Sequence, residues 1–329
     1  MVDPKPPSSM EINPIQTTWE WQRMARRSQW AVRFRRRVAF GMLIVCALIS
    51  LVVTFLTVTM LVVESSKFFL SPEVSVVGFL TQTRWTIGQT QGEIHYGIGP
   101  LVLGTLRVSG IGLGIALPIG LLSAIYLSEY ATPARRSFLK PVLEVLSGVP
   151  TVVLGFFAVT LFTPYLLASW GDFKPFNATS AGIAVGILCL PLVTTLVEDA
   201  LQMVPRRLRD AGHGMGATRM EVTLRVVLPA AYSGILSAFL LGAARAFGET
   251  MVVALAAGSA PVWTLDPRAP SQTMTGYILE TIISDSVVPG SITYHSIYAV
   301  AAVLFLLTLC VTILGQWLRQ VTRRKFGGS

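Results

Sequence analysis

Arg245 and Glu249 are two opposite charges in a strongly apolar part of the chain. They are four residues apart, so their side chains share one face if the segment is helical. A charge inside a membrane span costs about 2.5–3.5 kcal/mol on insertion scales, so such groups face a protein interior or a water-filled path. A guanidinium can donate two parallel hydrogen bonds to a tetrahedral oxyanion. We therefore predict an anion pathway that contains Arg245, Glu249 and Thr250; the alternative is a structural ion pair between helices.

A second feature is the polar, arginine-rich stretch 203–229, which separates two apolar stretches. Glycine allows a turn in which a Cβ would clash, and proline is favoured in the first turn of a helix. The stretch therefore predicts two short helices that lie along the membrane and receive a partner protein; the alternative is an ordinary basic loop. The residues that carry this prediction are Asp210, Ala211, Gly212, Gly216, Val226, Leu228 and Pro229.

These two features need a membrane-spanning framework, and the composition predicts one. Charged residues make up 13% of the 329 residues and hydrophobic residues 52%, whereas a soluble domain carries about 25% charged residues. A helix needs about 20 residues to cross the hydrocarbon core. Six uncharged stretches have about that length or more: 38–63, 108–128, 145–171, 175–197, 226–244 and 296–318. We predict an all-α integral membrane protein with six transmembrane helices, and a short outer helix over the apolar stretch 274–283.

The basic residues predict the orientation of these helices. Most of the 26 Lys and Arg residues lie in the two terminal tails and in the loops after the second and fourth spans, all on one side. The positive-inside rule places that side, with both termini, in the cytoplasm. The chain then divides into a partly mobile cytoplasmic tail with an interfacial helix (1–37), a membrane domain (38–318) and a second cytoplasmic tail (319–329). We expect the basic tails to contact anionic lipid and not nucleic acid.

Both chemical features resemble those of a known family. The spacing across 210–229 resembles the coupling loop of ATP-binding-cassette import permeases, which usually have Glu-Ala-Ala where this chain has Asp-Ala-Gly. The sequence Arg-Ala-Phe-Gly-Glu-Thr-Met at 245–251 resembles the fifth-helix signature of phosphate import permeases. Its Gly-Glu-Thr-Met is similar to the C type (PstC) of their two paired subunits. The stretches 125–131, 147–153 and 198–201 agree with this resemblance.

The resemblance implies a type I importer bundle in the bacterial inner membrane, with a cytoplasmic coupling helix. It implies that Arg245 and Glu249 take part in phosphate translocation, and that the loop 210–229 docks on an ATPase. The implied partners are a second permease subunit (PstA-like), an ATPase dimer (PstB-like) that binds ATP and magnesium, and an extracytoplasmic phosphate-binding protein (PstS-like). The alternatives are a permease for sulfate or molybdate, and an anion transporter or channel that needs no ATPase.

The sequence contains no nucleotide-binding loop of the G-x-x-x-x-G-K-[ST] type. His95, His213 and His295 are scattered without ligand spacing, so we expect neither a metal nor another bound cofactor. We predict that the chain is not an enzyme and that partner subunits hydrolyse ATP. Arg107 departs from the family pattern. We expect it to extend to the outer surface, to pair with an acid, or to add positive potential to the path.

Overall fold

The computed structural model describes residues 14–86, 94–284 and 287–326. Some parts of the predicted tails lie outside the described part: residues 1–13, residues 327–329 and the side chains of 14–34. The predicted interfacial helix depends on those side chains. The chain divides into two compact units, residues 1–60 and 61–329. In the first unit, every described residue belongs to α1 (Pro14–Leu70). Its apolar side chains from Val38 onward are largely exposed, as expected of a helix that faces lipid or another subunit.

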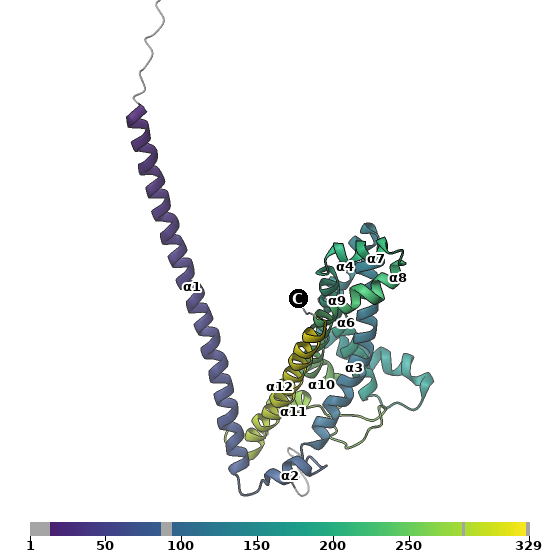
Figure 1. The fold of residues 1–329 in the computed structure, drawn as a ribbon. Helices are drawn as coiled ribbons and strands as arrows, with labels where there is room; N and C mark the ends of the chain where they lie inside the picture. Colours follow the sequence, from purple (N-terminus) through teal and green to yellow (C-terminus); the bar gives the residue numbers. More distant parts are fainter. Residues whose placement is uncertain (1–13, 87–93, 285–286, 327–329) are drawn as a thin grey trace, which may run out of the picture. The chain divides into compact units, whose positions relative to one another are not determined.

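The second unit is a bundle in which α3 (Gly99–Ile125), α6 (Ala178–Gln202), α9 (Leu228–Phe247) and α12 (Ile292–Phe326) run side by side (Figure 1). More of the apolar stretch of α6 is buried than that of any other candidate span, so α6 is the central helix. Small residues let α3 approach it closely, because a Cβ on Gly112 would lie 3.0 Å from the carbonyl oxygen of Gly182.

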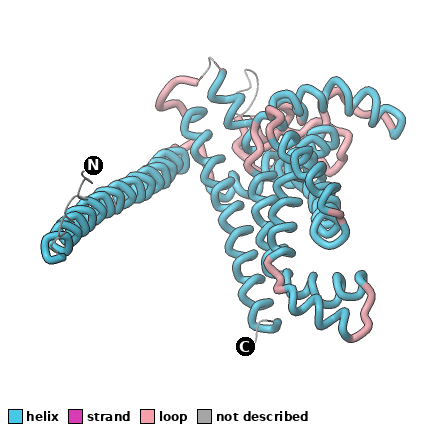
Figure 2. The backbone as a smooth tube through the Cα atoms, turned by 90° about the horizontal axis from the view of Figure 1, so that it is seen from above, coloured by secondary structure: helices cyan, strands magenta, loops and turns pink. Residues whose placement is uncertain are grey.

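Shorter helices surround this bundle, and α4, α7 and α8 gather at one of its ends (Figure 1). The short α-helices are α2 (Val76–Thr81), α4 (Pro133–Ser147), α5 (Thr151–Phe157), α7 (Arg206–Gly214), α8 (Arg219–Val222), α10 (Met251–Ala256) and α11 (Met274–Ile283). The π-helical segments are η1 (Tyr126–Tyr130), η2 (Ala158–Leu167) and η4 (Thr223–Val227), and η3 (Ala168–Trp170) is a 3-10 turn. Figure 2 shows that helix dominates the described chain, in which Trp85 and Tyr96 form an isolated β-bridge.

Six helices in the described chain are long and apolar enough to cross a membrane, which confirms the predicted all-α class and number of spans. The predicted helix over 274–283 is also present, as α11. Several boundaries differ from the predicted ones; the second span, for example, begins at Gly99 and not at residue 108. Two other differences have a visible local cause. The third span begins at Thr151 and not at residue 145, because Gly148 and Pro150 separate it from α4. The fifth span begins at Arg219, because α8, η4 and α9 follow one another with helical backbone throughout.

Candidate functional site

The fifth span is broken where the predicted anion pathway lies. Arg245 lies in the last turn of α9, which ends at Phe247 with Gly248 as its C-terminal cap. Glu249 and Thr250 therefore lie past the end of α9, and α10 begins at Met251. The sequence predicted one helix through both charges. A broken membrane helix instead leaves main-chain and side-chain polar groups near a path through the bundle.

The structure fixes Glu249 firmly. Its side chain is 3% exposed, and one carboxylate oxygen accepts a hydrogen bond of 3.2 Å from the backbone N–H of Val252, in the first turn of α10. Its carbonyl oxygen accepts a hydrogen bond of 2.7 Å from the hydroxyl of Thr275. Thr250 is half-buried, and its hydroxyl donates to the carbonyl of Gly248 at 3.2 Å. Glu249 is therefore an anchored negative charge at the helix break.

Arg245 is held loosely. Its side chain is 45% exposed, and its one ion pair among the described residues is with Glu249, with 3.6 Å between Nη2 and Oε2. A charge-assisted hydrogen bond is shorter, about 2.7–2.9 Å. The structural alternative from the sequence was an ion pair between helices, but the partner of Arg245 is four residues away along the chain. Most guanidinium donors of Arg245 are therefore available to a ligand.

Arg245 opens onto a hollow of about 360 Å³ between α4, α6 and α9, here called the Arg245 hollow. Its lining residues are Leu143, Glu144, Ser147, Leu188, Pro191, Leu192, Thr195 and Arg245. The wall is mostly apolar, and one cation, one carboxylate and two hydroxyls converge on it. A small ligand site commonly has this composition.

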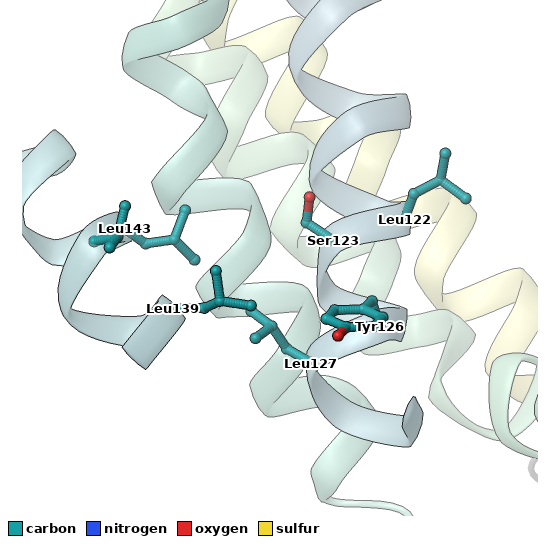
Figure 3. Close-up of a pocket in the computed structure, with 7 residues that line it drawn as sticks. Leu122, Ser123, Tyr126, Leu127, Leu139 and Leu143 are labelled. Atoms are coloured by element: carbon teal, nitrogen blue, oxygen red, sulfur yellow. The ribbon is translucent and has the colours of Figure 1, made fainter. Parts of the chain in front are cut away.

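A second hollow, of about 370 Å³, lies between α4 and the end of α3 with η1 (Figure 3). Figure 3 shows mainly leucine side chains around it, and the polar atoms among its lining residues are the hydroxyls of Ser123 and Tyr126. None of these lining residues is charged, so this hollow suits an apolar occupant. Leu143 lines both hollows, so α4 borders one space without charged groups and one that contains Glu144 and Arg245.

The two short helices predicted around Gly216 are α7 and α8; residues 206–222 are here called the coupling surface. Gly216 has φ +82°, a left-handed conformation that favours glycine, and its N–H donates to the carbonyl of His213 at 2.9 Å. Thr218 then begins α8 with a capping box. Its hydroxyl accepts from the N–H of Glu221, and the Glu221 carboxylate accepts from the N–H of Thr218 at 2.9 Å.

Close packing joins the coupling surface to the bundle. A Cβ on Gly212 would lie 2.9 Å from Cγ2 of Val222, so glycine at this position lets α7 pack directly on α8. Val222 and Val227 belong to a buried apolar cluster with Leu201 and Val204. The other predicted coupling residues differ in exposure: Asp210, Ala211, Gly216 and Pro229 are exposed, whereas Val226 and Leu228 are half-buried.

Two arginines tie the coupling surface to η1, a connection that the sequence analysis missed. Arg209 donates to both carboxylate oxygens of Glu129, at 2.9 and 3.3 Å, and also to the carbonyls of Leu201 and Val204, at 2.8 and 2.6 Å. The guanidinium carbon of Arg219 lies 5.9 Å from the ring centre of Tyr130. The sequence contains one signal for this contact: Glu129 is an acid at the end of the second span, and the stretch 203–229 is rich in arginine.

A fully buried acid, Glu198, joins α4 to α6 nearby. Arg136 Nη2 lies 2.7 Å from one of its oxygens and Lys140 Nζ lies 3.2 Å from the other. Gln202 donates a further hydrogen bond of 2.8 Å to Glu198. Because Arg136 and Lys140 each retain partial exposure, the pairing neutralises Glu198 without full burial of either cation. α4 is therefore fixed against the C-terminal half of α6.

Arg107 forms no ion pair with an acid among the described residues, which was one of the three expectations from the sequence. Its guanidinium donates to four main-chain carbonyls of the loop before α11: Thr264 at 2.6 Å, Asp266 at 2.9 Å, Ala269 at 3.4 Å and Pro270 at 3.1 Å. This loop folds over the guanidinium, so carbonyl oxygens and not a carboxylate accept the hydrogen bonds of its two terminal nitrogens. Arg107 therefore holds the loop in place.

Comparison with known proteins decides the family. The profile of the binding-protein-dependent transport system inner membrane component matches residues 116–324. The chain belongs to this family. It is 30% identical over 280 residues to the probable ABC transporter permease YqgH of Bacillus subtilis, with 85% of this chain and 89% of the relative covered. It is also 30% identical over 281 residues to the phosphate transport system permease PstC 1 of Mycobacterium tuberculosis, with 74% and 82% covered.

A solved structure gives the same fold. A bacterial ABC transporter involved in the import of alginate has a chain that matches with a TM-score of 0.61 at 15% identity, with 88% of this chain and 98% of that chain covered. The predicted importer-permease bundle is confirmed by this likeness and by the family match. The protein is therefore a multi-pass membrane permease subunit of an ABC importer, and its relatives are permease subunits and not enzymes.

Proposed function

We propose that this chain is the PstC-type subunit of an ATP-driven phosphate importer and forms half of its translocation pathway. The observation that carries the proposal is the loosely held guanidinium of Arg245 beside the anchored carboxylate of Glu249. A planar, always charged guanidinium can donate two hydrogen bonds to a tetrahedral oxyanion. The similarity to PstC 1 of Mycobacterium tuberculosis supports phosphate as the cargo.

Glu249 neutralises Arg245 when no anion is present, and a passing phosphate takes its place. The 3.6 Å contact is long enough to be given up at little cost, whereas the buried Glu249 keeps its hydrogen bond from Val252. The acid thereby limits the leakage of other anions. Thr250, at the same helix break, adds a hydroxyl beside the path. No cofactor bound by this chain is needed, because ATP and magnesium are bound by the partner ATPase.

The coupling surface is the docking site for that ATPase. Four apolar side chains on and next to it are exposed in the isolated chain: Leu208, Met215, Met220 and Leu224. Such a cluster, rimmed by arginines, suits a protein interface. Motion of the surface reaches η1 and α3 through Arg209 and Glu129, and it reaches α9, and so Arg245, through the continuous helix 219–247.

The proposed assembly contains a second, PstA-like permease subunit, a PstB-like ATPase dimer and a PstS-like extracytoplasmic phosphate-binding protein. It lies in the bacterial inner membrane with both termini of this chain in the cytoplasm. The basic loops around α4 and α7 support this orientation.

Uptake of labelled phosphate tests the cargo. In cells without other phosphate importers, expression of the complete transporter should give ATP-dependent uptake that unlabelled phosphate, but not sulfate or molybdate, inhibits. Inhibition by sulfate or molybdate, with no effect of phosphate, would assign another oxyanion.

Co-purification tests the class of transporter. The solubilised permease should retain an ATPase, and replacement of the exposed Met215 and Met220 by Asp should release it. A permease that transports the anion without any retained ATPase would instead be an ATP-independent transporter or channel.

A further inference from the structure

The proposed function uses Arg245, Glu249 and Thr250, but the Arg245 hollow contains three more polar groups. Glu144 and Ser147 come from α4, and Thr195 comes from α6. Glu144 and Ser147 are three residues apart, so they share one polar face of α4, and Thr195 adds a single hydroxyl from α6 to the same hollow. Nothing in the proposed pairing of Arg245 with Glu249 accounts for them.

The ion pairs of Glu198 set the position of this polar face. Arg136, Lys140 and Glu144 follow one another at intervals of four residues along α4, so they share one side of that helix. Arg136 and Lys140 bind Glu198 on α6. The same side of α4 must therefore face α6 one turn further on, where Glu144 lines the hollow.

Glu144 differs from the other two acids of this region, because their carboxylates have partners and its own has none within the described ranges. Glu198 is neutralised by two cations, and Glu249 accepts a hydrogen bond from Val252 and lies beside Arg245. Glu144 is exposed, and its carboxylate has no ion pair or hydrogen bond within the described ranges. A free carboxylate beside a cation in an anion path needs an explanation, because it repels a fully ionised anion.

The protonation of phosphate supplies that explanation. Near neutral pH, phosphate retains at least one proton and can donate a hydrogen bond, whereas sulfate retains none. An ionised carboxylate can only accept hydrogen bonds, so it attracts a P–OH group and repels sulfate. The hydroxyl of Ser147 donates to the carbonyl of Glu144 at 2.7 Å, and that of Thr195 to the carbonyl of Pro191 at 2.9 Å. Each hydroxyl can rotate to donate to an anion in the hollow instead, and each can also accept a hydrogen bond. A cation, an obligate acceptor and two hydroxyls together match a protonated tetrahedral anion.

We propose that Glu144, Ser147 and Thr195 form a selectivity subsite next to Arg245, in which the Glu144 carboxylate accepts a hydrogen bond from the protonated oxygen of phosphate. This proposal rests on the proposed phosphate path through Arg245. It adds a step at which the permease itself, and not only its binding protein, distinguishes phosphate from sulfate. A hydrogen bond to a charged group contributes about a tenfold to hundredfold change in affinity.

Cysteine protection tests the subsite. Ser147→Cys and, separately, Thr195→Cys are made in the complete transporter after the exposed Cys46 and Cys310 are replaced by alanine. The complex is placed in nanodiscs, and each cysteine is modified with an anionic methanethiosulfonate reagent. Inorganic phosphate should slow modification about tenfold or more, and sulfate at equal ionic strength should not. Val142→Cys, which faces the apolar hollow, is the matched control and should react at the same rate with either anion.

Glu144→Gln tests the selectivity. A glutamine side chain is neutral and can donate as well as accept, so sulfate should now protect Ser147→Cys about as well as phosphate does. The proposal is overturned if neither cysteine reacts, if phosphate gives no protection, or if sulfate protects equally when Glu144 is present. Retention of the ATPase during purification shows that each variant is assembled.

The failure of this proposal can be distinguished from failure of the proposed function. If Arg245→Leu abolishes phosphate uptake while phosphate leaves both cysteines unprotected, the path through Arg245 stands and the subsite is wrong. If Arg245→Leu transports phosphate normally, the path itself is wrong.

Discussion

Arg107 and Arg245 are both arginines inside apolar helices, yet their surroundings differ completely. Arg107 donates to four carbonyl oxygens of one loop. Arg245 has a single ion pair at 3.6 Å among the described residues, and 45% of its side chain is exposed. Both terminal nitrogens of Arg107 donate to carbonyl oxygens of the fold, although its Nε has no partner among the described residues, whereas most donors of Arg245 are available to a ligand. The difference shows that a charge in a membrane span can serve structure or ligand, depending on how many of its hydrogen bonds the fold itself supplies.

Arg209 lies between these two cases. It donates to Glu129 and to two carbonyls, but it belongs to the coupling surface at the edge of the bundle. Its side chain is 19% exposed. If an arginine with many hydrogen bonds to the fold is structural, the loss of stability on substitution should fall from Arg107 to Arg209 to Arg245. The direct effect of substitution on transport, compared with its effect on stability, should rise in the same order.

Arg107→Leu should have the largest effect on stability. It removes four hydrogen bonds from a charged donor and leaves carbonyl oxygens unpaired, so we expect a loss of roughly 3–5 kcal/mol. The melting temperature and yield of the purified permease complex measure this loss. Arg107→Lys is the control and should recover part of it, because a lysine has three donors on one nitrogen. An Arg107→Leu complex that melts like the unaltered one would show that the loop does not depend on this arginine.

Arg209→Leu should have an intermediate effect on stability, about 1–3 kcal/mol, because its contacts are partly exposed. Its main consequence should be a coupling surface that is no longer fixed to η1. We expect weaker retention of the ATPase and fewer anions transported per ATP hydrolysed. Arg206→Leu is the matched control on the same helix, since Arg206 is exposed and has no ion pair within the described ranges. Equal effects of the two substitutions would contradict the assigned anchoring role.

Thr218→Ala should have the smallest effect. It removes the hydroxyl of an exposed capping box, which costs about 1 kcal/mol, and Thr218→Ser should restore it. Hydrogen exchange of the Glu221 amide should become about fivefold faster, with the rest of the bundle unchanged. Retention of the ATPase should remain close to normal. If Thr218→Ala instead released the ATPase as strongly as Arg209→Leu, local helix order and not the arginine anchor would govern docking.

The sequence predicts the framework of this molecule well. Long uncharged stretches have few alternatives to a membrane helix, so the six spans are visible in the composition alone. Gly216 marks the turn between α7 and α8 because few other residues adopt its positive φ. Helix 274–283 is visible for another reason: it is a short, mostly apolar stretch with turn residues on both sides.

The partners of the charged groups could not be predicted in the same way. The carbonyl acceptors of Arg107 lie more than 150 residues away and carry no side-chain signal. The helix break after Phe247 depends on tertiary contacts such as the hydrogen bond from Thr275 to Glu249. Glu129 and Arg209 are 80 residues apart, and each alone could be a solvated surface charge. Only the fold brings these pairs together.

ATP-driven phosphate uptake by Arg245→Leu tests the central claim most directly. The reconstituted transporter should retain its ATPase, and its stability should lie within about 1 kcal/mol of that of the unaltered complex, because Arg245 makes one long ion pair among the described residues. Phosphate uptake should fall about tenfold to hundredfold, the loss expected when hydrogen bonds from a charged donor to the anion disappear. Uptake near the unaltered rate, or a loss of stability as large as that of Arg107→Leu, would contradict the assignment of Arg245 as the open, anion-binding arginine.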